Sequence, residues 1–272
     1  MDITQFIIFL VGVIFLPLLF TKIIDIELSK KKPVYAFFVA IFFVLIGFIA
    51  AFFIFASMLS IVMITFSSLF ILPFVIKVLA PIEEHKKNKL YFYDWFSLKN
   101  FEGIMKKYDN MIRFYIFAFF GIAFAYTFLF TILGNNMVEA AFSQQLGLFT
   151  PGEFNLSFFD IVENNLQVLI LSFMFCIFYG AGSIFILNYK ASIVGVVYGT
   201  ALRAFFWQVP VVFNILAFIP HTVLEVLAYL LAAVAGGILS QSRNYRDAVV
   251  MLVISIFLLL IAGYAEVVFL NA

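Results

Sequence analysis

One stretch of the sequence restricts the fold more than any other. Residues 34–79 are almost continuously apolar, and Lys77, near the end, is their only charged residue. A helix crosses the hydrocarbon core of a bilayer with about 20 residues, so this stretch is too long for one span and fits two. It predicts a tight hairpin of two membrane helices, with the turn near Ser57–Ser60.

The composition agrees with a membrane protein. Hydrophobic residues make up 65% of the 272 residues and charged residues 11%, whereas soluble domains average about 45–50% and 25%. Backbone polar groups in lipid must pair within the chain, which favours helices. We therefore predict an all-α, polytopic transmembrane helical bundle, with the lipid bilayer as its surroundings.

Residue counts exclude several functional classes. The net charge of +1 gives no basic surface for nucleic acid. Cys176 is the only cysteine, so the chain can form no internal disulfide, and two histidines are too few for a multi-histidine metal centre. We expect no metal, no cofactor and no nucleic-acid partner.

The apolar stretches predict about eight spans. They are 3–20, the two helices of 34–79, 112–133, 165–187, 192–218, 222–239 and 248–268. The first is expected to be retained as a span, because Asp2 stands where a signal peptide carries positive charge and no small-residue cleavage site follows. The predicted regions are N-terminal spans in 1–133, an extracytoplasmic loop at 134–163 and a C-terminal membrane domain at 164–272.

Two polar segments separate the spans, and each predicts a short interfacial helix. In the cytoplasmic segment 81–110, residues 97–108 are amphipathic, with Ser97 placed to cap the first turn. This helix would steady the bundle or dock a cytoplasmic partner. In the second segment, residues 135–149 predict a short helix lying on the extracytoplasmic surface.

Basic residues predict the orientation. Every lysine and arginine except Arg203 falls on one side of the eight-span arrangement, whereas the loop 134–163 on the other side has acidic residues and no basic ones. Basic loops mark the cytoplasmic side. We expect a multi-pass protein of the cell membrane with both termini extracytoplasmic.

Arg203 is the exception, and its neighbours indicate which way it points. It lies about 20 Å along a helix from Lys190, deep in the predicted bilayer, where an uncompensated charge costs about 2.5–3.5 kcal/mol. Gly195 and Gly199 form a GxxxG pattern on the same stripe, which is typical of close helix packing. This face is expected to meet protein.

Acidic partners for Arg203 are found in the last two spans. His221 and Glu225 are one turn apart, Gly236 shares the face of Glu225, and Glu266 follows small residues near the end of the chain. We predict a buried polar cluster of Arg203, His221, Glu225 and Glu266. It would be an ion-pair network that fixes helix packing, a site for an ion or small polar solute, or, least favoured, a catalytic centre, since His221 and Glu225 offer at most two zinc ligands.

The C-terminal half resembles the stage II sporulation protein M family over about residues 155–270. The resemblance rests on ENNLQV with Asn164 and Asn165, on the glycine-rich segment around Asn188, and on PHTVLE with His221 and Glu225; Thr222 stands where the family usually has glycine. In spore-forming bacteria the namesake is an anchor and scaffold in a membrane complex with peptidoglycan-degrading partners. The resemblance implies that the five polar residues stand at matching positions, where amide and imidazole groups bridge helices.

These observations favour one function over two others. The favoured one is a non-catalytic scaffold or anchor with protein partners in a membrane complex, with a homo-oligomer left open. The alternative is a transporter or channel for an ion or small polar solute that uses the polar cluster. An intramembrane enzyme ranks last.

Overall fold

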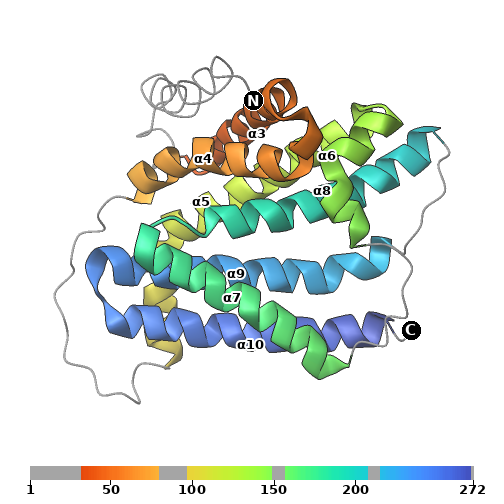
Figure 1. Ribbon diagram of the computed structural model, residues 1–272. Coiled ribbons are helices and arrows are strands. Elements are labelled where there is room, and N and C mark those ends of the chain that lie inside the picture. The colour runs from red at the N-terminus through yellow and green to blue at the C-terminus, as the bar shows by residue number, and fades with distance from the viewer. Residues whose placement is uncertain (1–31, 80–96, 149–156, 208–214, 271–272) are drawn as a thin grey trace. The chain divides into compact units, whose positions relative to one another are not determined.

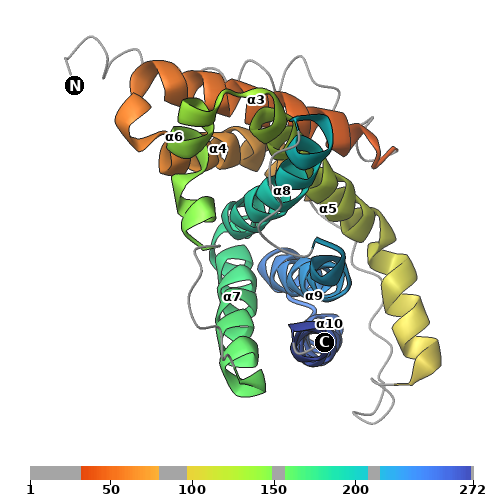
Figure 2. The same ribbon diagram turned by 90° about the vertical axis from the view of Figure 1, so that its right-hand side faces the viewer.

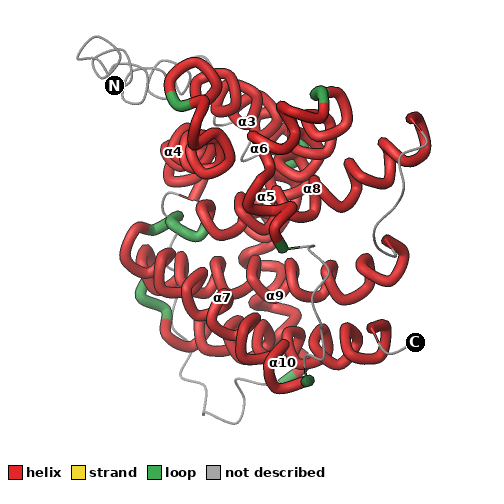
Figure 3. The backbone as a smooth tube through the Cα atoms, turned by 45° about the vertical axis from the view of Figure 1, so that its right-hand side comes forward, coloured by secondary structure: helices red, strands yellow, loops and turns green. Residues whose placement is uncertain are grey.

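The computed structural model describes residues 32–79, 97–148, 157–207 and 215–270. In these ranges the chain forms helices and turns and no strand (Figure 3). The helices are α3 (Tyr35–Ile54), η1 (Ala56–Met58), α4 (Leu59–Leu79), α5 (Leu98–Ile132), α6 (Asn135–Gly147), α7 (Phe158–Tyr179), α8 (Ile184–Trp207), α9 (Ile215–Ser242) and α10 (Tyr245–Leu270) (Figure 1).

The predicted polytopic helical fold is confirmed. Among the described residues, seven helices are long and apolar enough to cross a membrane. They correspond to the predicted spans after the first, and the predicted span 3–20 lies outside the described residues. The expected hairpin turn is present, since α3 ends at Ile54 and α4 begins at Leu59.

The chain divides into two compact units, each built from three stretches of sequence. Unit 1 comprises Met1–Val75, Phe117–Phe154 and Leu187–Ile215, and unit 2 comprises Ile76–Ile116, Asn155–Ile186 and Leu216–Ala272. Unit 1 thus holds α3, α4, α6, the second half of α5 and most of α8. Unit 2 holds the first half of α5 together with α7, α9 and α10.

The segment predicted to be cytoplasmic, 81–110, differs from the prediction where it is described, from residue 97 onward. The expected amphipathic helix and the expected span 112–133 are one continuous helix, α5, of 35 residues. Its start is as predicted, because the Asn100 amide donates a hydrogen bond to Ser97 Oγ over 3.3 Å. No proline or glycine separates Tyr108 from Ile112, so nothing in the sequence ends the helix between them.

The sixth predicted span has other boundaries. Instead of 192–218, α8 runs from Ile184 to Trp207, and its preceding turn contains Gly180 with a φ of 67°. Lys190, expected in the loop, therefore lies inside α8. Glycine adopts this left-handed conformation without penalty, so the turn falls at Gly180 and not at the lysine.

In unit 2, α7 and α9 lie parallel to each other and α10 runs antiparallel to α7. Asn165 near the start of α7 bonds to Glu225 of α9, and about three turns further along both helices a Cβ on Gly236 would come within 2.7 Å of Cys176 Cβ. A Cβ on Gly263 of α10 would lie 2.9 Å from Val162 in the first turn or two of α7. Figure 2 shows α9 and α10 side by side, viewed nearly along their axes.

In unit 1, α8 packs closely on α5. A Cβ on Gly195 would approach Tyr126 Cβ to 2.5 Å, and one on Gly199 would approach Phe130 Cβ to 2.8 Å. The two glycines therefore allow the backbone of α8 to contact side chains of α5 directly. Helix α6 forms where a short helix was predicted and packs on this unit through one face, which buries Val138, Ala141, Phe142 and Gln145; its place at the membrane surface stays a prediction.

Candidate functional site

The candidate site lies in unit 2, on the inner stripe of α7. This helix begins with a reciprocal capping pair, in which the Asp160 amide donates to Ser157 Oγ and the Ser157 amide donates to Asp160 Oδ2. The helical register set there buries Ile161, Asn165, Leu169, Ser172 and Cys176. Asn165 is thereby turned towards α9, whereas the neighbouring Asn164 is exposed.

Asn165 bridges two side chains of α9. Its Nδ2 donates a hydrogen bond to Glu225 Oε1, and its Oδ1 accepts one from the Tyr229 hydroxyl over 2.9 Å. All three side chains are nearly inaccessible, with exposed fractions of 4% for Asn165, 8% for Glu225 and 0% for Tyr229. The amide therefore uses both of its ends to join α7 to two successive turns of α9.

Two further predicted residues lie in the same unit. His221, one turn before Glu225 on α9, is 7% exposed. Glu266 on α10 is half-buried. The structure thus brings a carboxylate, an amide and a phenol together between α7 and α9, with Glu266 of α10 in the same unit. Such a group of atoms can hold helices together, bind a proton or hold a small cation.

Arg203 belongs to unit 1, at the end of α8. Its Nη2 donates to the Leu133 carbonyl over 2.9 Å and to Asn135 Oδ1 over 3.1 Å, and its guanidinium lies 5.6 Å from the centre of the Phe130 ring. In the described range α8 ends four residues later, at Trp207, and the depth of Arg203 in the bilayer stays a prediction. Its pairing with Glu225 and Glu266 would join the two units and stays a prediction.

The position of Arg203 has a local explanation. Leu133 directly follows α5, and its carbonyl is one of the helix-terminal acceptors that lack an intrahelical partner. A cation near a helix C-terminus also interacts favourably with the helix dipole. Arg203 therefore caps α5 and anchors the start of α6.

Asn188, the third asparagine of the predicted motif, makes a second polar cluster in unit 1. Its Nδ2 lies 2.9 Å from the Ile64 carbonyl and 2.7 Å from both Ser67 Oγ and Ser68 Oγ on α4. Ser67 Oγ in turn lies 3.0 Å from the Tyr126 hydroxyl. Among the described residues, Asn188 Oδ1 has no hydrogen-bond partner.

The sequence reasoning missed two polar groups that the structure shows as central. Tyr229 is one turn after Glu225, and this spacing was the signal that could have placed it in the cluster. Asp247 is fully buried and accepts hydrogen bonds from Lys107, Tyr108 and Asn244. The three-residue spacing of Asn244 and Asp247 is a helix-start signal, but no sequence pattern relates either to Lys107, far away in the chain.

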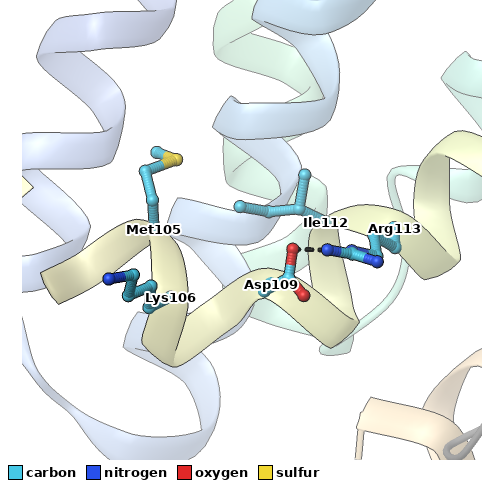
Figure 4. Close-up of a pocket in the computed structure, with 5 residues that line it drawn as sticks. All are labelled: Met105, Lys106, Asp109, Ile112 and Arg113. Carbon is cyan, nitrogen blue, oxygen red and sulfur yellow. Dashed lines mark hydrogen bonds and ion pairs between the residues drawn. The ribbon is translucent and has the colours of Figure 1, made fainter. Parts of the chain in front are cut away.

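No group of three or more histidine, cysteine, aspartate or glutamate side chains in the described ranges could hold a metal ion. A hollow of about 300 Å³ lies against α5 and is lined by Met105, Lys106, Asp109, Ile112 and Arg113 (Figure 4). Arg113 pairs with Asp109 over 2.7 Å, and Lys106 pairs with Glu102 on the same helix. The charges at this hollow are thus balanced along α5 and indicate no separate binding site.

Comparison with known proteins places the chain in a family. The family model described as stage II sporulation protein M matches residues 111–269, more than half of the chain. No curated protein and no solved structure matches it. The matched region begins in α5, well before the resemblance predicted from residue 155. It contains the whole Asn165 cluster and Asn188 itself, whereas the α4 partners of Asn188 lie outside it. The chain belongs to the stage II sporulation protein M family.

Proposed function

We propose that this protein is a non-catalytic scaffold or anchor that holds other proteins in a complex at the cell membrane. The observation that carries the proposal is the bridge from Asn165 to Glu225 and Tyr229. These buried polar groups bond to one another across helices, which fixes how α7 and α9 pack. A fixed bundle suits a protein that presents surfaces to partners.

The ends of unit 2 support the proposed orientation. Its exposed or half-buried basic side chains gather where α5 begins and α9 meets α10; they are Lys106, Lys107, Arg113, Arg243 and Arg246. Gly237 of α9 belongs to the same end, since a Cβ there would lie 2.7 Å from Met111 of α5. Asp160, Glu163 and Glu266 lie at the other end, where α7 starts and α10 finishes. Basic ends face the cytoplasm, so we place the α9–α10 turn inside and the opposite end of unit 2 outside.

Affinity purification from the native host in mild detergent, read by mass spectrometry, tests the scaffold directly. We expect proteins that co-purify in stoichiometric amounts with the tagged wild type and not with an unrelated multi-span protein carrying the same tag. Asn165→Leu is expected to lose these partners, because it loosens α7 from α9, and Asn164→Leu to retain them. Wild-type protein that purifies alone would contradict the scaffold.

A transporter or channel is the second candidate, and it is favoured by the buried carboxylate of Glu225 and by Glu266 in the same unit. Glu225→Gln separates it from the scaffold. A glutamine oxygen can still accept the Asn165 hydrogen bond, so a scaffold should keep both its fold and its partners. A transporter that moves ions or protons through the cluster should keep the fold and lose flux in reconstituted vesicles. Flux carried equally by wild type and variant would exclude this cluster as the pathway.

A further inference from the structure

The turn between α9 and α10 places a strongly basic residue at the membrane surface. Two helices that can span the membrane, His221–Ser242 and Tyr245–Val268, are separated by Arg243 and Asn244 alone. A turn this short between two spans must lie where hydrocarbon gives way to water. Tyr245, the next residue, is 67% exposed, and exposed tyrosines concentrate at this boundary.

The turn is joined to α5 through Asp247. Its Oδ2 accepts hydrogen bonds from Lys107 Nζ over 2.8 Å and from Asn244 Nδ2 over 2.8 Å. Its Oδ1 accepts from Arg246 Nε over 3.0 Å and lies 3.0 Å from Arg246 Nη2. Lys107 and Arg246 therefore converge on one carboxylate that is itself fully buried.

The charges around this carboxylate do not balance. Lys107 and Arg246 have side-chain exposures of 22% and 27%, and Arg243, adjacent to Asn244 in the turn, is exposed. Two cations thus contact one anion, and a third, Arg243, lies in the adjoining turn. The excess positive charge faces water or lipid headgroups, because the carboxylate is covered and the cations are not. A guanidinium has five N–H donors, of which Arg246 directs two at Asp247.

The backbone at Arg243 adopts a conformation that favours glycine. Its φ of 48° is in the left-handed region, and it is the one residue other than glycine with a positive φ among those described. The α7–α8 turn of the same unit uses Gly180 at a φ of 67°. Glycine adopts this conformation without steric cost and arginine does not. The strained arginine therefore points to a function of its guanidinium.

We propose that Lys107, Arg243 and Arg246 bind the phosphate headgroup of an anionic phospholipid at the α9–α10 turn. Arginine and lysine are the side chains that bind phosphate through charge-assisted hydrogen bonds. A lipid is favoured over free phosphate because the turn lies directly between two membrane helices, beside an exposed tyrosine. The site is independent of whether the protein is a scaffold or a transporter.

The test uses the full-length protein in mild non-ionic detergent. Native mass spectrometry counts bound dioleoyl phosphatidylglycerol and dioleoyl phosphatidylcholine, and thermal unfolding is followed with each lipid and with inorganic phosphate. We expect phosphatidylglycerol to bind and to raise the unfolding temperature more than the other two. Arg243→Gly should weaken its binding about five-fold, the equivalent of ~1 kcal/mol for one basic residue at a membrane surface.

The same variant separates binding from folding. Because glycine relieves the strained backbone, lipid-free Arg243→Gly should unfold at the wild-type temperature or above it. Arg243→Gln, which keeps a polar side chain and loses the charge, should weaken lipid binding similarly. Lys106→Gln is the matched control, since Lys106 is next to Lys107 but is 76% exposed and paired with Glu102; it should bind phosphatidylglycerol within two-fold of wild type.

Three results would overturn the proposal. The first is phosphatidylglycerol binding that is unchanged in both Arg243 variants. The second is binding of phosphatidylcholine by the wild type as tight as that of phosphatidylglycerol, which would mean that the site does not distinguish the charge of the headgroup. The third is stabilisation by inorganic phosphate as large as that by phosphatidylglycerol, which would assign the site to a free anion.

Discussion

At the scale of single residues, Asn165 and Asn164 differ in burial and in hydrogen bonding although they are neighbours in sequence. Asn165 is 4% exposed and joins Glu225 to Tyr229, whereas Asn164 is exposed on the other side of α7. Hydrogen bonds between membrane helices contribute about 0.6–2 kcal/mol each. Asn165→Leu should therefore lower the free energy of unfolding by about 1–3 kcal/mol, measured by thermal or denaturant unfolding in detergent.

Asn164→Leu is the matched control for this prediction. It makes the same change of side chain one residue earlier, on an exposed face, and should leave the unfolding temperature near that of the wild type. Equal destabilisation by the two variants would contradict the bridge, because it would mean that leucine in this part of α7 is harmful regardless of burial.

Arg203 gives a second prediction at this scale. It donates to the Leu133 carbonyl at the end of α5 and to Asn135 at the start of α6, and a cation at a helix C-terminus contributes about 0.3–1 kcal/mol. Arg203→Leu should speed amide hydrogen exchange in residues 133–141, and Arg203→Lys, which keeps the charge, should speed it less. If exchange rises around Glu225 instead, the predicted ion pair between Arg203 and the acidic residues would be supported in place of the cap.

At the scale of elements, α6 shows how a polar sequence can still be buried. Gln145 is fully buried, accepts a hydrogen bond from Ser60 on α4 over 3.1 Å and donates one to Ser192 on α8 over 2.9 Å. Phe142 interrupts the helical backbone with φ −126° and ψ 19° and packs on Tyr126 and Phe130. The end of α6 is thus held inside unit 1 by one amide and one ring.

Gln145→Leu tests this attachment. It removes both hydrogen bonds and leaves two buried serines without their partner, so the free energy of unfolding should fall by about 1–3 kcal/mol. Residues 142–148 should also exchange their amide hydrogens faster. Gln144→Leu, on the exposed side of α6, is the control and should change neither quantity. An unaltered Gln145→Leu protein would mean that Phe142 alone holds the helix.

The elements also show what the sequence could predict and why the rest escaped. Apolar length identified every described membrane helix, since a span must be about 20 residues long whatever it packs against. The ends of the helices were predicted less accurately than their existence. Helix α5 continues through Tyr108 because no residue there breaks a helix. Helix α8 begins before Lys190 because a long lysine side chain is tolerated inside a membrane helix near its end. The clusters of Asn165, Asn188 and Asp247 join residues 60 to 140 positions apart. Such pairs depend on tertiary packing, which no local pattern records.

At the scale of the whole molecule, the family assignment and the helices agree on a multi-pass membrane protein, and charge indicates how it is oriented. In unit 2, α7 and α9 run parallel and α10 returns between their ends, so each end of the unit gathers residues distant in sequence. One end collects the lysines and arginines together with their acidic partners Glu102, Asp109 and Asp247, whereas the described residues of the other end include acidic residues and no lysine or arginine. This separation arises from folding, and it is the arrangement that the positive-inside rule predicts for a membrane protein.

Cysteine labelling of intact cells tests the orientation. Glu163→Cys, exposed near the start of α7, should react with a membrane-impermeant maleimide added outside, because the acidic end of unit 2 is expected to face outwards. Lys106→Cys, at a side chain that is 76% exposed on α5, should react only after the cells are opened. The wild type is the control: Cys176 is fully buried and should stay unlabelled in both conditions. The reverse labelling pattern would mean that the protein has the opposite orientation in the membrane. The basic turn at Arg243 would then lie on the extracytoplasmic side, and the lipid that it binds would belong to the outer leaflet.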